Sequence, residues 1–186
     1  MNHRSVRRNE RGITLLEAVV VMTIVGILAV IAIPAFTYVT NANRIAAEAN
    51  GLLGDMQFAR AEAVKEGQTV TVCVSTNGTS CSANNTNWQN GWIVFSDVNG
   101  NQQVDNGTDT VLRVQSAFTS ADTFVANNNV AAVTFNREGF AAGGGIANGA
   151  MIALHAKTPT NASTRCLSVT LVGLVSVVNY DGATCL

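Results

Sequence analysis

One acidic side chain stands alone in a long apolar stretch near the N-terminus. Glu17 follows the segment Arg11-Gly12-Ile13-Thr14-Leu15-Leu16, and the next charged residue along the chain is Arg44. A carboxylate inside a membrane helix costs about 3 kcal/mol and usually marks a functional residue. Glu17 is therefore the first candidate site residue, able to pair with a positive charge. The alternative is a carboxylate that lies among lipid headgroups and has no role.

The four cysteines can form disulfides or remain thiols. Cys73 and Cys81 are 8 residues apart, and Cys166 and Cys185 are 19 apart, so no CxxC metal or redox motif is present. An even number of cysteines in a domain with export features favours disulfides, and the free thiols of a cytosolic protein are the alternative. We predict the pairs Cys73–Cys81 and Cys166–Cys185, although four cysteines allow three connectivities.

The remaining polar groups predict neither catalysis nor metal binding. Segment 97–105 has oxygen ligands at calcium-loop spacing, but Gln102 and Thr108 stand where such a loop needs glycine and glutamate, so we expect a polar turn. His155 lies in an apolar strand pattern, and no phosphate-loop or serine-hydrolase motif occurs. We therefore expect no enzyme activity, no cofactor and no metal.

The apolar stretch at 13–36 is long enough to hold Glu17 in a membrane. As a helix it spans about 36 Å, and a bilayer core is about 30 Å thick. Four arginines precede it within residues 1–12, which predicts a cytoplasmic N-terminus and places the rest of the chain outside the cytoplasm. A secretory signal is the competing interpretation, but its apolar region is shorter and ends at a small-residue cleavage site.

Charge is concentrated at the N-terminus. Charged residues make up 12% of the chain, about half of the usual ~25%. The first twelve residues hold four of the 11 basic residues and one of the 12 acidic ones, which leaves about −4 on the remainder. A mildly acidic body does not attract nucleic acid by bulk electrostatics.

A second helical pattern at 41–66 continues the apolar stretch. Its apolar residues recur at three- and four-residue spacing and predict one face packed on a sheet: Ile45, Ala49, Leu52, Met56, Ala59 and Ala63. Gly67 is the expected C-terminal cap. Pro34 can kink the long helix without ending it.

The chain after Gly67 reads as short strands separated by turns. The segments are rich in Val, Ile, Thr and aromatic residues, and the turns are rich in Asn, Asp and Gly. Expected strands are 69–74, 91–96, 111–116, 123–126, 130–136, 150–156 and 166–178. The last segment is long enough for two strands, with the bend at 172–174. These patterns predict a helix covered by antiparallel sheet.

The junction at 11–17 resembles the class III leader of type IV prepilins. In that family a membrane peptidase cuts after the glycine, so the resemblance implies cleavage between Gly12 and Ile13 and N-methylation of Ile13. Glu17 becomes the fifth mature residue, where the family has a glutamate, and Pro34 matches a helix proline twenty-two residues into the mature chain. Most members have phenylalanine where this chain has Ile13. In a filament, Glu17 would pair with the amine that cleavage exposes on a neighbouring subunit.

The following segments resemble one branch of that family. Residues 53–63 are similar to the helix signature of the FimT/FimU minor pilins and the GspH-type pseudopilin, and 70–73, 91–95 and 109–113 are similar to its strands. The resemblance implies a low-abundance subunit that starts or caps a filament. DNA-uptake members carry tail arginines in a Gly-Arg-x-Arg motif. Here 173–176 reads Gly-Leu-Val-Ser, so DNA is not an expected partner.

We therefore predict an α+β protein with a type IV pilin fold. Its expected parts are a leader (1–12), a transmembrane and assembly helix (13–40), the amphipathic half of that helix (41–66) and a β-rich globular head (67–186). The predicted function is that of a minor pilin. The alternatives are a GspH-type pseudopilin of a type II secretion system and a DNA-binding minor pilin.

The prediction also specifies partners and location. Expected partners are the prepilin peptidase/N-methyltransferase, other minor and major pilins, the inner-membrane assembly platform and membrane lipid. We expect a single-pass inner-membrane protein with its head in the periplasm, which then moves into the pilus, at its tip.

Overall fold

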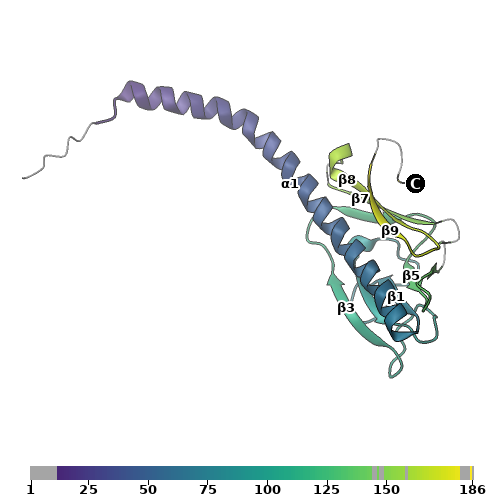
Figure 1. Ribbon diagram of the computed structural model, residues 1–186. Coiled ribbons are helices and arrows are strands. Elements are labelled where there is room, and N and C mark those ends of the chain that lie inside the picture. The colour runs from purple at the N-terminus through teal and green to yellow at the C-terminus, as the bar shows by residue number, and fades with distance from the viewer. Residues whose placement is uncertain (1–11, 144–145, 147–148, 158, 181–184, 186) are drawn as a thin grey trace, which may run out of the picture. The chain divides into compact units, whose positions relative to one another are not determined.

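The computed structural model of the chain describes residues 12–143, 146, 149–157, 159–180 and 185. The chain divides between Val39 and Thr40 into two compact units. One long helix, α1 (Leu15–Glu66), passes through both (Figure 1). The second unit, residues 40–186, is called the head unit below.

Antiparallel strands and short 3-10 helices make up the head unit together with the second half of α1. In chain order these elements are β1 (Val70–Val74), η1 (Trp88–Asn90), β2 (Gly91–Ser96), β3 (Thr110–Ser116), β4 (Thr123–Ala126), β5 (Ala132–Phe135), β6 (Ala141–Ala142), β7 (Ala150–His155), η3 (Asn161–Ser163), β8 (Thr164–Val169) and β9 (Val175–Asn179).

The strands form two sheets. The first has the order β3-β2-β1-β5-β6 and the second has the order β4-β7-β8-β9. Every described pairing is antiparallel. A long apolar helix with an antiparallel β-rich head confirms the predicted α+β fold, and the division into two sheets is a feature that the sequence patterns did not reveal.

The predicted apolar stripe of α1 forms the centre of the core. All six of its residues are 0% exposed, from Ile45 to Ala63. They belong to one buried cluster with alternating residues of β1, Val70, Val72 and Val74. The opposite face of β1 is also covered, because Cys73 belongs to a second cluster with Ile93 and Phe95 of β2. Burial on both faces explains why neither β1 nor β2 contains a charged residue.

The last predicted segment does divide into two strands at a glycine. A turn over residues 170–174 joins β8 to β9, and Gly173 has φ +75°. A Cβ atom at Gly173 would collide with the carbonyl oxygen of Gly139, so only glycine fits there. The two-residue strand β6 was not predicted, because two alanines carry no strand pattern.

Candidate functional site

The start of α1 places the predicted cleavage bond outside the helix. Residues 12–14 are not helical, and α1 begins at Leu15. Thr14 caps the helix: its Oγ1 accepts a hydrogen bond from the Glu17 N–H (3.2 Å), and its carbonyl oxygen accepts one from the Ala18 N–H (3.1 Å). Gly12 and Ile13 therefore precede the first hydrogen-bonded turn, and Glu17 is the third helical residue.

The large apolar side chains of the first unit are exposed in the single chain. Ile13 is 78% exposed, Leu16 is 76% and Phe36 is 71%. An 18-residue window of α1 has a mean hydropathy of 2.8 and no buried residue, so this helix is long and apolar enough to cross a membrane. Such a surface requires lipid or other apolar helices around it.

Pro34 lies inside α1 and does not end it. Its ring lacks an N–H, so one hydrogen bond of the helical ladder is missing at this turn. The Thr37 hydroxyl donates to the Pro34 carbonyl oxygen (2.9 Å), and the Thr23 hydroxyl donates to that of Val19 (2.8 Å). Threonine hydroxyls thus find acceptors within the helix, which lowers the cost of polar groups in an apolar surrounding.

Three segments of the predicted family signature meet at Asp55. Its Oδ2 accepts a hydrogen bond from Trp92 Nε1 (2.9 Å), and its Oδ1 accepts one from Arg113 Nη1 (2.9 Å). The guanidinium carbon of Arg113 also lies 3.7 Å from the ring centroid of Phe58. Helix α1 is thereby joined to β2 and β3 by one carboxylate.

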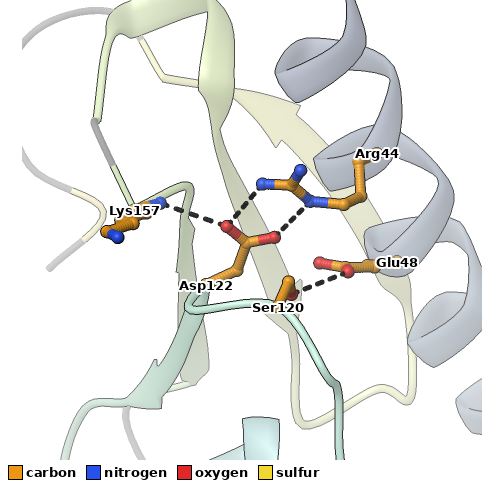
Figure 2. A network of polar contacts seen from close by, with 5 residues as sticks. All are labelled: Arg44, Glu48, Ser120, Asp122 and Lys157. Atoms are coloured by element: carbon orange, nitrogen blue, oxygen red, sulfur yellow. Dashed lines mark hydrogen bonds and ion pairs between the residues drawn. The ribbon is translucent and has the colours of Figure 1, made fainter.

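A second polar network joins α1 to the loop before β4 (Figure 2). Arg44 forms a two-pronged ion pair with Asp122, with Nε–Oδ2 at 2.6 Å and Nη2–Oδ1 at 2.8 Å. The backbone N–H of Lys157 donates to the same carboxylate (3.1 Å). Ser120 donates to Glu48 Oε1 (3.4 Å), and Glu48 Oε2 is buried without a hydrogen-bond partner in the described chain.

The two carboxyl groups of this network respond differently to their surroundings. Burial raises the pKa of Asp122, but hydrogen bonds from Arg44 and the Lys157 N–H and the positive charge of Arg44 outweigh it, so the net pKa lies below its ordinary value. Burial and the neighbouring Asp122 charge raise the pKa of Glu48 above its ordinary value, against the opposing effect of Arg44. Asp122 is therefore a stabilised anion, whereas an ionised Glu48 is destabilised.

Two disulfides hold the strands of the head unit. Cys73 of β1 is bonded to Cys81, and Cys166 of β8 is bonded to Cys185. These are the two pairs that the sequence analysis expected, and the first fastens β1 to the loop that follows it. The described chain contains no free cysteine.

The predicted polar turn at 97–105 is held by its own hydrogen bonds. The amides of Asn99 and Asn101 both donate to Asp105 Oδ2 (2.8 Å each), so this carboxylate faces N–H donors. His155 lies in β7, and its Nδ1 is 3.2 Å from the Thr164 hydroxyl on β8. Both observations agree with structural roles for these residues.

Sequence reasoning missed the partners of two charged helix residues. Arg44 and Asp55 each bond a group more than fifty residues away in the sequence. The pairing with Asp122 left no local signal because one partner lies in an irregular loop. For Asp55 the signal was its place in the family signature, which also contains Trp92 and Arg113.

The fold and the exposed apolar helix define the class of pilin-like membrane-anchored proteins. The family model for the prokaryotic N-terminal methylation motif matches residues 7–33. The model described as type II transport protein GspH matches residues 48–173, and the chain therefore belongs to the GspH family. The methylation motif implies processing by a prepilin peptidase.

The fold can also be compared with solved structures. The type IV minor pilin FimU of Pseudomonas aeruginosa superimposes with a TM-score of 0.58 and 18% identity, over 76% of this chain and 93% of that one. A second crystal form of FimU gives 0.54 and 18%, over 74% and 95%. The minor pseudopilin EpsH of Vibrio cholerae gives 0.44 and 9%, over 72% and 94%. The FimU likeness confirms the fold alone. A comparison with curated proteins gave no match.

The chain is therefore a pilin-like subunit of the GspH family with an N-terminal methylation motif. Proteins of this kind are structural subunits and assemble with other pilins. The apolar helix indicates membrane anchoring.

Proposed function

We propose that this chain is a minor pilin that helps to start or cap a type IV pilus. In this proposal the prepilin peptidase cuts between Gly12 and Ile13 and methylates Ile13. Helix 13–40 holds the subunit in the inner membrane with its head unit in the periplasm, and then moves sideways into the filament. The assembly platform and other minor and major pilins are its partners.

One observation carries the proposal: α1 has a buried half and an unburied half. From Ile45 to Ala63 one face is fully buried in the head unit, whereas the large apolar side chains from Ile13 to Phe36 are exposed. The second surface is too large and apolar to remain in water. Lipid covers it before assembly and neighbouring helices cover it in the filament, where small residues such as Gly26, Ala29 and Ala32 permit close approach.

Glu17 sets the axial position of the subunit among the neighbouring helices of the filament. Its carboxylate lies one helical turn from the new N-terminus, on a helix with no other charge before Arg44. The amine that cleavage exposes on a neighbouring subunit supplies the opposite charge. Pairing neutralises both groups in an apolar interior, where an unpaired charge costs several kcal/mol. Processing and assembly are linked because the amine exists only after cleavage.

A pseudopilin of a type II secretion system is the second candidate. The family match favours it, because the matching model is described as a type II transport protein. The helix would act in the same way, within a short periplasmic filament. A DNA-binding role lacks comparable support, since no basic residue follows Arg165.

A gene deletion with complementation separates the candidates. Loss of surface pili and twitching, restored by the wild-type gene, supports the pilus subunit. Loss of exoprotein secretion with normal piliation supports the pseudopilin and contradicts the first proposal. Pull-down of the complemented protein from membranes should recover other minor pilins, and a gel shift with DNA should show no salt-sensitive binding.

A further inference from the structure

A hollow of about 230 Å³ on the first sheet has a lining of side-chain amides. It lies away from α1, between the loop after Cys81, the loop after β2 and the segment before β5. Its polar wall consists of Ser82, Asn84, Asn101, Gln102, Gln103 and Asn129. We call it the amide hollow. Ala83, Ala131, Ala132 and the Cys73–Cys81 disulfide complete it, and none of the described residues that line it is charged.

The backbone around the amide hollow has an uncommon conformation. Four non-glycine residues of the described chain have positive φ, and three of them line the hollow: Asn84 (61°), Gln102 (62°) and Asn129 (56°). The fourth, Asn128 (51°), is adjacent but does not line it. A left-handed glutamine is disfavoured and persists only where surrounding contacts hold it.

Those contacts are present at Gln102. The fully buried carboxylate of Asp97 accepts hydrogen bonds from the N–H groups of Asn101 and Gln102 (3.0 Å each). The Gln102 amide nitrogen donates to the Thr134 hydroxyl (3.1 Å). A Cβ atom at Gly143 would lie 2.7 Å from that nitrogen, so the glycine leaves room for it. This wall of the hollow is fixed before any ligand arrives, which reduces the entropic cost of binding.

Several amides of the hollow have unused hydrogen-bonding capacity. The side chains of Asn84, Gln103 and Asn129 form no hydrogen bond within the described chain. Each carboxamide offers two donors and one acceptor with two lone pairs. A neutral surface with alternating donors and acceptors complements adjacent hydroxyl groups, and the small apolar floor can contact C–H groups. We propose that the amide hollow binds a neutral carbohydrate.

The charges and the strand pairing favour this ligand class over others. An anion or a cation would find no opposite charge among the lining residues. A peptide that adds a strand would need a free sheet edge, but β1 is paired with β2 on one side and with β5 on the other. The hollow is compact and suits one sugar unit more than an extended chain.

Saturation-transfer NMR on the full chain tests the proposal without relying on processing or assembly. The chain is held in a detergent that has no sugar headgroup, and the probes are galactose, glucose, mannose and N-acetylglucosamine at millimolar concentration. The variant Asn84→Gly/Asn129→Gly removes two amides, and glycine keeps the left-handed backbone without strain. Asn128→Gly is the matched control, because its backbone is also left-handed and its side chain lies outside the hollow.

We expect a transfer signal from at least one sugar. The double variant should weaken it about tenfold, because the hydrogen bonds of two neutral amides are lost, while the control keeps it. If the double variant unfolds by tryptophan fluorescence, Gln103→Ala replaces it. No signal from any sugar, or equal signals in all variants, would overturn the proposal. Crosslinking of the variant Gln103→Cys to a neighbouring pilin in cells would also overturn it, since the hollow would then be a protein interface.

Discussion

The two halves of α1 use the same secondary structure for different purposes. The half in the head unit carries charged residues with partners on other elements, and its apolar stripe is fully buried. The half before Val39 carries Glu17 as its only charge and exposes its apolar side chains. The apolar surface of the first of these halves is covered within the single chain, whereas that of the second needs lipid or other subunits to cover it. Mutations in the two halves should therefore affect different measurements.

The largest expected effect is on assembly. Glu17→Ala should reduce surface pili to near zero, because the amine of the neighbouring subunit would lose its partner in an apolar interior. Electron microscopy of complemented deletion strains measures this. Head-unit stability should be unchanged. The matched control is Glu66→Ala at the other end of α1, which should assemble normally. Equal numbers of pili with Glu17→Ala and wild type would contradict the role of Glu17.

A pair of leucine truncations compares the halves directly. Leu52→Ala removes a fully buried side chain and should lower the free energy of unfolding by about 2–5 kcal/mol. Leu28→Ala, in the exposed half, should change it by no more than about 0.5 kcal/mol. Denaturation of the full chain in detergent can be followed by the fluorescence of Trp88 and Trp92, both buried in the head unit. Similar losses for both variants would show that the halves are not energetically distinct.

Breaking the Arg44–Asp122 pair should have an intermediate effect. Arg44→Ala removes the charged partner of the Asp122 carboxylate. The Asp122 side chain is 0% exposed, and that of Arg44 is 39% exposed. Solvent screening limits the expected loss to about 1–3 kcal/mol. Arg137→Ala, in the exposed pair with Glu138, is the control and should show no measurable loss.

The pH dependence of that loss has a defined sign. Because the folded pKa of Asp122 is lowered, its contribution is present above the ordinary value of 3.8 and disappears as pH falls through the folded value. The difference between Arg44→Ala and wild type should therefore shrink in acid. A difference that stays constant down to low pH would contradict the ion-pair account.

The smallest expected effect is a gain. The folded pKa of Glu48 is raised, so folding favours its neutral form, and this contribution is lost as pH rises from the ordinary value of 4.5 through the folded value. Glu48→Gln should stabilise the chain at neutral pH by at most about 1 kcal/mol, and the gain should vanish below pH 4.5. Denaturation at the two pH values checks this, with Glu66→Gln as the control. A gain that is independent of pH would point to packing instead.

The sequence predicted the features that depend on local pattern. The stripe from Ile45 to Ala63, the turn at Gly173 and the α+β fold follow from hydrophobic periodicity and from the conformational needs of glycine. The division into two sheets and the Arg44–Asp122 network could not be predicted in this way, because they depend on the pairing of distant segments. The amide hollow was hidden for the same reason, since its polar residues come from three separate loops.

The most direct test of the account is the N-terminus of the protein purified from membranes of a strain with an active prepilin peptidase. Intact-mass and peptide mass spectrometry should show a chain that begins at N-methylated Ile13 and keeps the exposed apolar half of α1. A chain that retains residues 1–12, or that begins downstream of Val39, would contradict it.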